Sequence, residues 1–206
     1  MLDGQRIIKV MKDNGYRVLA RNVVYIGSCD SNGDLYPQAP DEWNDIRLIV
    51  SDKGEVIFKQ AATIRPGQYY MDNPMNADGC ALVAYGQHRD GWTFGTHGHS
   101  FPHDALVQCN DIRVHRVNDG SFSRASEPRW VGAECGINNH STYPGYDGGV
   151  GNWSAGCLVG LDFEGHERFI QLLSDSGRVM FDVTLLPWRL VFGDGLMNEG
   201  VAPLVR

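Results

Sequence analysis

The sequence predicts a mainly β fold with a few helices, of the α+β class, arranged as a sandwich or barrel. Short segments rich in β-branched and aromatic residues follow one another from Asp45 onward, separated by glycine-rich connections. Helical spacing of apolar residues is confined to residues 3–14 and 164–173. Because strands succeed one another without helices between them, the pattern favours a sandwich or barrel over alternating βαβ units.

An amphipathic helix is predicted at the start of the chain, from Asp3 to Asn14. Asp3 is a residue type that accepts hydrogen bonds at a helix N-cap, and Gly15 is typical of a C-terminal stop. Residues 16–19 and 23–26 are predicted to follow as strands.

A loop at residues 28–43, rich in Asp, Asn, Gly and Pro, is the best candidate for a domain boundary. Residues 1–43 are therefore expected to form a helix and strand extension packed on the core, and residues 44–206 a catalytic domain. The tail from Gly193 is expected to be an irregular surface segment. Further strands are expected at residues 46–50, 56–61, 81–85, 92–96, 105–108, 112–117 and 179–186.

Composition and charge exclude several classes of partner. The 206-residue chain has a net charge of −7, whereas proteins that bind nucleic acid concentrate Lys and Arg, so no nucleic-acid partner is expected. There is no run of about 18 apolar residues, so no segment is expected to span a membrane. The first residues lack the basic and apolar regions of a secretory signal, so the protein is expected to be cytoplasmic on synthesis.

The five cysteines form an odd set with no Cys-x-x-Cys pair, which is typical of reduced, mostly buried thiols. At least one must be unpaired within a single chain. Cys157 is predicted to be the reactive one. The set comprises Cys29, Cys80, Cys109, Cys135 and Cys157.

The surroundings of Cys157 favour nucleophile chemistry. A thiol reacts well only as a thiolate, so it needs a base nearby, and His140 is the candidate. The loop at residues 142–149, rich in glycine, can turn the chain back toward the cysteine. Gly156 leaves room for a substrate carbonyl and lets backbone N–H groups face an oxyanion, and Ser154 adds a hydroxyl there.

Residues 140–142 (His-Ser-Thr) and 154–157 (Ser-Ala-Gly-Cys) resemble the signature of L,D-transpeptidase catalytic domains, in which His-Gly/Ser precedes a Ser/Thr-His-Gly-Cys block. Two further segments match in order. Residues 63–70 look like the family's Thr-Pro-x-Gly-x-aromatic segment, and residues 177–183 are similar to its closing Gly-x-x-Val strand. The resemblance implies an L,D-transpeptidase-like β sandwich or barrel and covers about residues 45–186.

The resemblance also implies roles for individual residues. Cys157 would attack an amide carbonyl and form a thioester, and His140 would take the thiol proton. The backbone carbonyl of Ser141 would orient the imidazole. N–H groups around Gly156 and Cys157, with Ser154, would hold the oxyanion.

Two departures from the family signature stand beside the cysteine. The family's second histidine is replaced by Ala155, and its Arg or Asn after the cysteine is replaced by Leu-Val-Gly at residues 158–160. His97 is expected to supply the missing imidazole from another strand and help orient the substrate.

The leading hypothesis is a cysteine-dependent peptidase that cleaves peptide stems of bacterial peptidoglycan and uses no metal or cofactor. The missing secretory segment favours hydrolysis by an enzyme of the phage-lysis kind, which reaches the wall after release. The alternative is an L,D-transpeptidase that forms wall cross-links. A non-catalytic wall-binding module is a further alternative.

A zinc peptidase is a rival hypothesis, because neutral imidazoles bind zinc well. Asp104 is available as its base. Glycosidase chemistry would need two facing carboxylates, for which Glu134 and Asp162 are candidates. The histidines of the rival zinc site are His97, His99 and His103.

Overall fold

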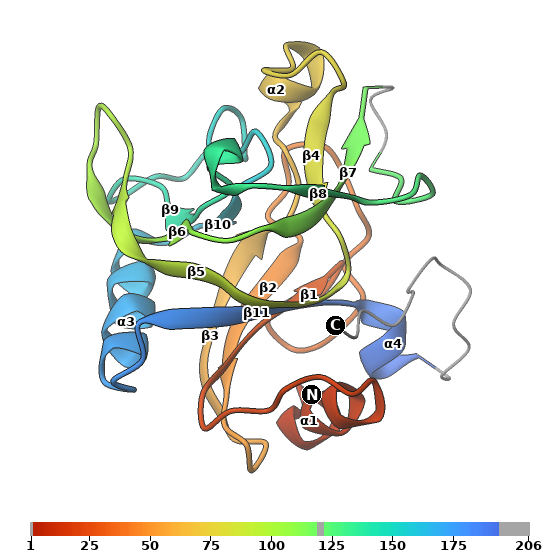
Figure 1. Ribbon diagram of the computed structural model, residues 1–206, viewed down its shortest axis with the longest axis vertical. Helices are drawn as coiled ribbons and strands as arrows, with labels where there is room; N and C mark the ends of the chain where they lie inside the picture. Colours follow the sequence, from red (N-terminus) through yellow and green to blue (C-terminus); the bar gives the residue numbers. More distant parts are fainter. Residues whose placement is uncertain (1, 119–121, 194–206) are drawn as a thin grey trace.

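Most of the chain folds into a closed β barrel with a second, smaller sheet (Figure 1). The structure, a computed structural model, describes residues 2–118 and 122–193. Strands of the barrel follow the order β1-β11-β5-β6-β9-β10-β3-β2, and β2 pairs with β1 to close it. They are β1 (Asn22–Gly27), β2 (Asp45–Val50), β3 (Val56–Thr63), β5 (Gly86–His97), β6 (His103–Gln108), β9 (Asn139–Ser141), β10 (Leu158–Gly160) and β11 (Met180–Pro187).

The smaller sheet has the order β4-β7-β8 and lies above β5 and β11 in the view of Figure 1. Its strands are β4 (Cys80–Val83), β7 (Ile112–Val117) and β8 (Arg129–Val131). The helical segments are α1 (Gly4–Asp13), α2 (Gln68–Asp72), the 3-10 turn η1 (Ala133–Cys135), α3 (Phe163–Ser174) and α4 (Trp188–Phe192). The predicted class, mainly β with a few helices, is confirmed.

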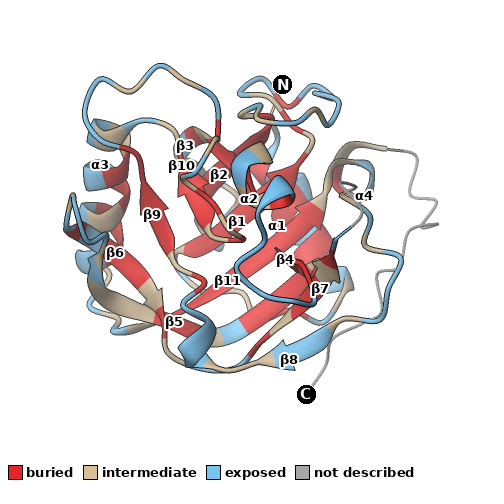
Figure 2. Cartoon of the chain, turned by 90° about the horizontal axis from the view of Figure 1, so that it is seen from above, coloured by how far each residue is buried: buried red, intermediate tan, exposed pale blue. Residues whose placement is uncertain are grey.

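The main apolar core fills the barrel and reaches the smaller sheet, as the buried strands in Figure 2 show. Tyr25, Trp92 and Val183 come from barrel strands, Val83 comes from β4, and Phe169 comes from α3. Since one cluster joins all three parts, the smaller sheet and α3 are held by the same apolar burial that forms the barrel.

A second core covers the outer face of β1 and β2. All six residues of β1 are buried, because Val23 and Tyr25 face the main core while Val24 and Ile26 face helices α1 and α4. Helix α1 begins as predicted, since the Asp3 carboxylate accepts the N–H of Gln5 at 2.9 Å.

The prediction of a strand at residues 16–19 was wrong. The backbone of this segment is hydrogen-bonded to a side chain instead of to a neighbouring strand. The N–H of Arg17 donates to Gln87 Oε1 at 2.8 Å, and Gln87 Nε2 donates to the Arg17 carbonyl at 2.8 Å. One amide side chain thus satisfies both backbone groups that a strand partner would have paired.

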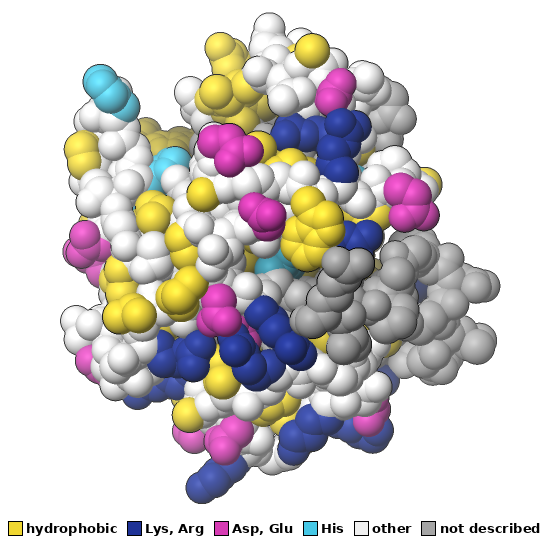
Figure 3. All heavy atoms as spheres, in the orientation of Figure 1, with side chains coloured by type: hydrophobic (Ala, Val, Ile, Leu, Met, Phe, Trp, Pro, Cys, Tyr) yellow, Lys and Arg dark blue, Asp and Glu magenta, His cyan; other side chains and the backbone are white. Residues whose placement is uncertain are grey.

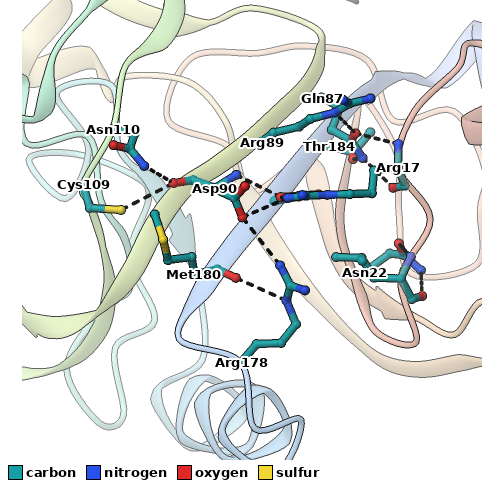
Figure 4. Close-up of polar contacts among 12 residues, drawn as sticks. Arg17, Asn22, Gln87, Arg89, Asp90, Cys109, Asn110, Arg178, Met180 and Thr184 are labelled. Atoms are coloured by element: carbon teal, nitrogen blue, oxygen red, sulfur yellow. Dashed lines mark hydrogen bonds and ion pairs between the residues drawn. The ribbon is translucent and has the colours of Figure 1, made fainter. Parts of the chain in front are cut away.

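Arg17 also anchors the N-terminal segment through an ion cluster beside β5 and β11 (Figure 4). Its Nε donates to Asp182 at 2.6 Å and its Nη2 donates to Asp90 at 2.9 Å. The backbone N–H of Asp90 donates to Asp182 at 2.9 Å, and Arg178 lies 3.6 Å from the Asp90 carboxylate. Each charged group in this cluster has an opposite charge beside it.

Other predicted elements were confirmed, several of them with shifted ends. The hairpin at residues 46–61 became β2 and β3, and residues 112–117 became β7. Strand β5 is longer than the predicted 92–96 segment, and the short strands β8, β9 and β10 were not predicted.

The predicted boundary between residues 43 and 44 falls on the connection between β1 and β2, which are neighbours in the barrel. The first 43 residues therefore supply a strand of the barrel as well as helix α1. The predicted irregular tail lies, beyond Gly193, outside the described residues. No helix within the described ranges is long and apolar enough to cross a membrane.

Candidate active site

Two short parallel strands, β9 and β10, carry the predicted catalytic residues. His140 lies on β9 opposite Val159 of β10, and Cys157 directly precedes β10. Side chains two residues apart on a strand share a face, and paired residues of neighbouring strands point the same way. Cys157 is therefore set on the face of the β9 and β10 pair that carries His140.

A glycine-rich loop of residues 142–157 joins the two strands without a helix, as the sequence predicted. Residues outside the loop hold it in place. The N–H of Gly67 donates to the Ser154 carbonyl at 2.9 Å, and a Cβ at Gly67 would lie 2.0 Å from the carbonyl oxygen of Gly151. Asp41 accepts the N–H of Gly151 at 3.0 Å. The segment 63–70, part of the family resemblance, thus contacts this loop.

A glycine is required at position 156 because of the backbone conformation there and because the chain passes close to β4. Its φ is +135°, and a Cβ there would lie 2.7 Å from the carbonyl oxygen of Ala81. Its N–H donates to Ser154 Oγ at 3.1 Å, and that hydroxyl donates to the Cys157 carbonyl at 2.8 Å.

These hydrogen bonds correct the expected oxyanion site. The N–H of Gly156 and the hydroxyl of Ser154 are already bonded to each other and to the chain, so they shape the turn instead of facing a substrate. The N–H of Cys157, in contrast, donates to no group within the described ranges. It is the donor left for an oxyanion.

The thiol of Cys157 is half-buried and hydrogen-bonded only to backbone. Its Sγ accepts the N–H of Asn138 at 3.4 Å and lies 3.7 Å from the carbonyl oxygen of Gly136. Burial raises the pKa of the Cys157 thiol to about 11, against a smaller lowering by the Asn138 hydrogen bond. At neutral pH the group is therefore a thiol and needs a base to become a nucleophile.

His140 has the protonation state that such a base requires. Its Nδ1 lies 2.9 Å from the Ser141 carbonyl, which can only accept, so the proton of the neutral ring is on Nδ1. Burial is the main cause that lowers the pKa of His140 well below its ordinary value. The other nitrogen, Nε2, is buried and has no hydrogen-bond partner among the described residues, including Cys157.

His97 lies against His140, as expected for a second imidazole from another strand. The two rings stack with their centroids 3.7 Å apart at 14°. Asn138 Oδ1 accepts the N–H of Gln108, so its Nδ2 faces His97 Nδ1 at 3.0 Å and donates to it. The proton of His97 is therefore on Nε2. Burial lowers the pKa of His97 to about 4, so the ring is neutral.

The rival zinc cluster is not assembled. His103 lies opposite His97 in the β5 and β6 pair, but its Nδ1 is 2.9 Å from the Phe101 carbonyl and its Nε2 accepts the N–H of Ser141 at 3.2 Å. His99 is exposed in the β5–β6 turn. Histidine side chains are visible on the face of the molecule drawn in Figure 3. Among the described residues, no three His, Cys, Asp or Glu side chains are grouped to hold a metal ion.

Sequence reasoning missed a buried polar group behind the site. His166, inside a segment predicted only as a helix, lies with its Nε2 2.7 Å from the Asp104 carbonyl and its Nδ1 3.2 Å from Arg47 Nη1. Arg47 is fully buried and also donates to Asn139 at 3.0 Å. A charged residue in an otherwise apolar strand, Ile-Arg-Leu-Ile-Val, was the signal that could have revealed it.

The remaining candidates lie apart from this arrangement or serve the fold. Asp162 caps helix α3 by accepting the N–H of Gly165 at 2.7 Å, and Glu134 is exposed on η1. On the loop between His140 and Cys157, three aromatic rings contact one another. They are Tyr143, Tyr146 and Trp153.

Comparison of the chain with protein-family models, with curated proteins and with solved structures gave no match in any of the three. The resemblance to L,D-transpeptidases therefore rests on the short sequence motifs alone.

Proposed function

We propose that this protein is a cysteine-dependent peptidase that cleaves peptide stems of bacterial peptidoglycan through a thioester. The observation that carries the proposal is the neutral His140, whose Nδ1 proton is held by the Ser141 carbonyl while the buried Nε2 is left without a partner. A buried polar atom without a partner is costly, so it needs a reason. A role as general base toward Cys157 supplies one.

The proposed reaction begins when the Cys157 sulfur attacks an amide carbonyl and its proton passes to His140 Nε2. The backbone N–H of Cys157 stabilises the resulting oxyanion. The neutral ring of His97, stacked on His140, offers its Nε2–H group as a further hydrogen-bond donor. The carbon–nitrogen bond then breaks, and the leaving amine takes the proton from His140. Water attacks the thioester carbonyl and gives a proton to Nε2. The carbon–sulfur bond then breaks, the acid is released, and the leaving sulfur takes the proton back from Nε2 to restore the thiol and the neutral imidazole.

Sulfur and base are not hydrogen-bonded to each other in the structure, since Sγ contacts backbone atoms of Asn138 and Gly136. Catalytic hydrogen bonds are often long or poorly aligned before substrate binds. The reaction requires the Cys157 sulfur to leave these backbone contacts and approach His140 Nε2.

Hydrolysis is preferred over transpeptidation because the residues after the cysteine offer nothing to bind a second peptide. Leu158 and Val159 are fully buried and apolar, and they occupy the place where the family has Arg or Asn. Water needs no such binding group.

The test is digestion of purified peptidoglycan, with the products read by mass spectrometry. New amine-bearing peptide ends, produced in the presence of EDTA and absent with C157A, are expected. New cross-links would instead show a transpeptidase, and loss of activity with EDTA would show a zinc peptidase. The C135A variant is the matched control, because Cys135 is a second free cysteine with an exposed side chain.

A further inference from the structure

The backbone N–H of Ser141 is held by a side chain instead of a strand. Strands β6 and β9 pair at one position, Leu106 with Asn139, so their ladder does not reach Ser141. The Ser141 N–H donates to His103 Nε2 at 3.2 Å, and Ser141 is fully buried. Without His103, this N–H would be left buried and unsatisfied.

His103 has a single arrangement of protons that satisfies both contacts. The Ser141 N–H can only donate, so Nε2 of His103 carries a lone pair. The Phe101 carbonyl can only accept, so Nδ1, 2.9 Å away, carries the proton. Because both nitrogens are occupied, His103 has no nitrogen left for a metal or for proton transfer.

Ser141 is the residue that sets the protonation of the general base. Its carbonyl accepts the Nδ1 proton of His140 at 2.9 Å, and its hydroxyl donates to the Gly160 carbonyl at 3.0 Å. The direction of the carbonyl depends on the backbone angles of Ser141, which its N–H contact with His103 helps to fix.

We propose that His103 is a positioning residue for His140, an inference that rests on the proposed function. By holding the Ser141 N–H, His103 keeps the Ser141 carbonyl on Nδ1 of His140 and leaves the lone pair on Nε2. Its ring also contacts the neighbouring imidazoles edge to face, with centroids 5.8 Å from His97 and 5.9 Å from His140.

A second buried histidine, His166, packs against the ring of His103. His166 lies with its ring centroid 5.6 Å from that of His103, and its Nε2 donates to the carbonyl of Asp104, the next residue on β6. Arg47 can only donate, so it fixes the lone pair of His166 on Nδ1. His166, His103 and His140 are thus each restricted to one protonated nitrogen.

The experiment compares H103L, which removes the acceptor, with H103Q, whose Oε1 stands near the place of Nε2. H99Q, a change at an exposed histidine of the same turn, is the matched control. For H103L we expect kcat on peptidoglycan to fall by about 10²-fold with KM unchanged, because a small misplacement of a catalytic group has this effect. H103Q should recover most of the loss.

A second readout needs no substrate. NMR of the histidine ring nitrogens should show His140 protonated on Nδ1 in the wild type and in H103Q, and a mixture of both ring forms in H103L. A merely structural histidine would not change the protonated nitrogen of His140. The wild-type spectrum should also show His103 protonated on Nδ1, a measurement that holds even where H103L does not fold.

The positioning role is overturned if His103 carries its proton on Nε2 in the wild type, or if H103L keeps both kcat and the ring form of His140. Absence of peptidoglycan turnover in the wild type would overturn the proposed function separately, since the NMR result stands without it.

Discussion

A partly exposed ion cluster and a buried histidine cluster of this barrel differ in how completely their polar groups are hydrogen-bonded or ion-paired. Around Arg17, the guanidinium contacts Asp90 and Asp182, and the Asp90 backbone N–H donates to the Asp182 carboxylate (Figure 4). Around His140, four neutral imidazoles lie together and one buried ring nitrogen has no partner among the described residues.

We interpret the difference as one between a cluster that stabilises the fold and a cluster that carries the proposed chemistry. Buried polar groups are normally hydrogen-bonded, so the complete pairing of the groups around Arg17 is what folding alone requires. An unpaired buried acceptor lowers stability, and in the proposed function this acceptor, His140 Nε2, supplies the base. Mutations in the two clusters should therefore affect different quantities.

The largest effect is expected at the sulfur. C157A should reduce peptidoglycan turnover by at least about 10⁴-fold, because no other group can form the thioester. Its free energy of unfolding should change by less than about 1 kcal/mol, since the side chain is half-buried and bonds only weakly. Product analysis and denaturant unfolding measure the two quantities. Residual turnover near the wild-type level would contradict the assignment of the nucleophile.

Acid should unfold the protein through the histidines. Burial lowers the pKa of His88 and His97 to about 4 and that of His166 to about 2, from an ordinary value of 6.5. The unfolded chain therefore binds more protons than the fold, and stability is lost as pH falls from about 6.5 toward 4. His88 alone contributes roughly 3 kcal/mol to this loss, at about 1.4 kcal/mol per pKa unit.

Urea unfolding at a series of pH values measures this loss. A free energy of unfolding that stays constant between pH 7 and pH 4 would show that the rings are not buried in their neutral form.

The third effect concerns His97. H97F keeps a ring to stack on His140 and removes the N–H donor, so kcat should fall by about 10²-fold, as for the loss of one oxyanion donor. Steady-state kinetics on a defined stem peptide measure it. Unchanged kcat would show that His97 only supports the His140 ring.

The smallest effect is expected in the ion cluster. R17M leaves Asp182 buried without its cation, which should cost roughly 2 kcal/mol of unfolding free energy because Arg17 itself is partly exposed. Its kcat should equal that of the wild type. Thermal unfolding and kinetics on the same preparation test both statements, and a fall in kcat at full stability would connect the two clusters.

The sequence predicted the coarse fold, because strand patterns are local features, and the His-Ser and Gly-Cys spacing pointed to the residues of the candidate site. It could not predict β9 and β10, since three-residue strands carry no periodicity. It misassigned residues 16–19, where a distant amide from Gln87 replaces the strand partner. Such pairings depend on contacts far apart in the chain.

The roles of single atoms were the least predictable part of the site. Ser154 and Gly156 were expected to hold an oxyanion, and the structure bonds them to each other. His103 was expected as a ligand of the rival zinc site, and it accepts the backbone N–H of Ser141 instead. Asn138 was not singled out at all, although its backbone N–H contacts the sulfur and its side chain fixes His97. Hydrogen-bond directions follow from the fold and have no sequence pattern of their own.

Intact-protein mass spectrometry after brief acid quenching of a reaction with peptidoglycan stem peptides tests the central claim most directly. We predict an adduct with the mass of the acyl stem, located on Cys157 and absent from C157A. Peptide cleavage by the wild type without any adduct, together with undiminished cleavage by C157A, would contradict a thioester at this sulfur.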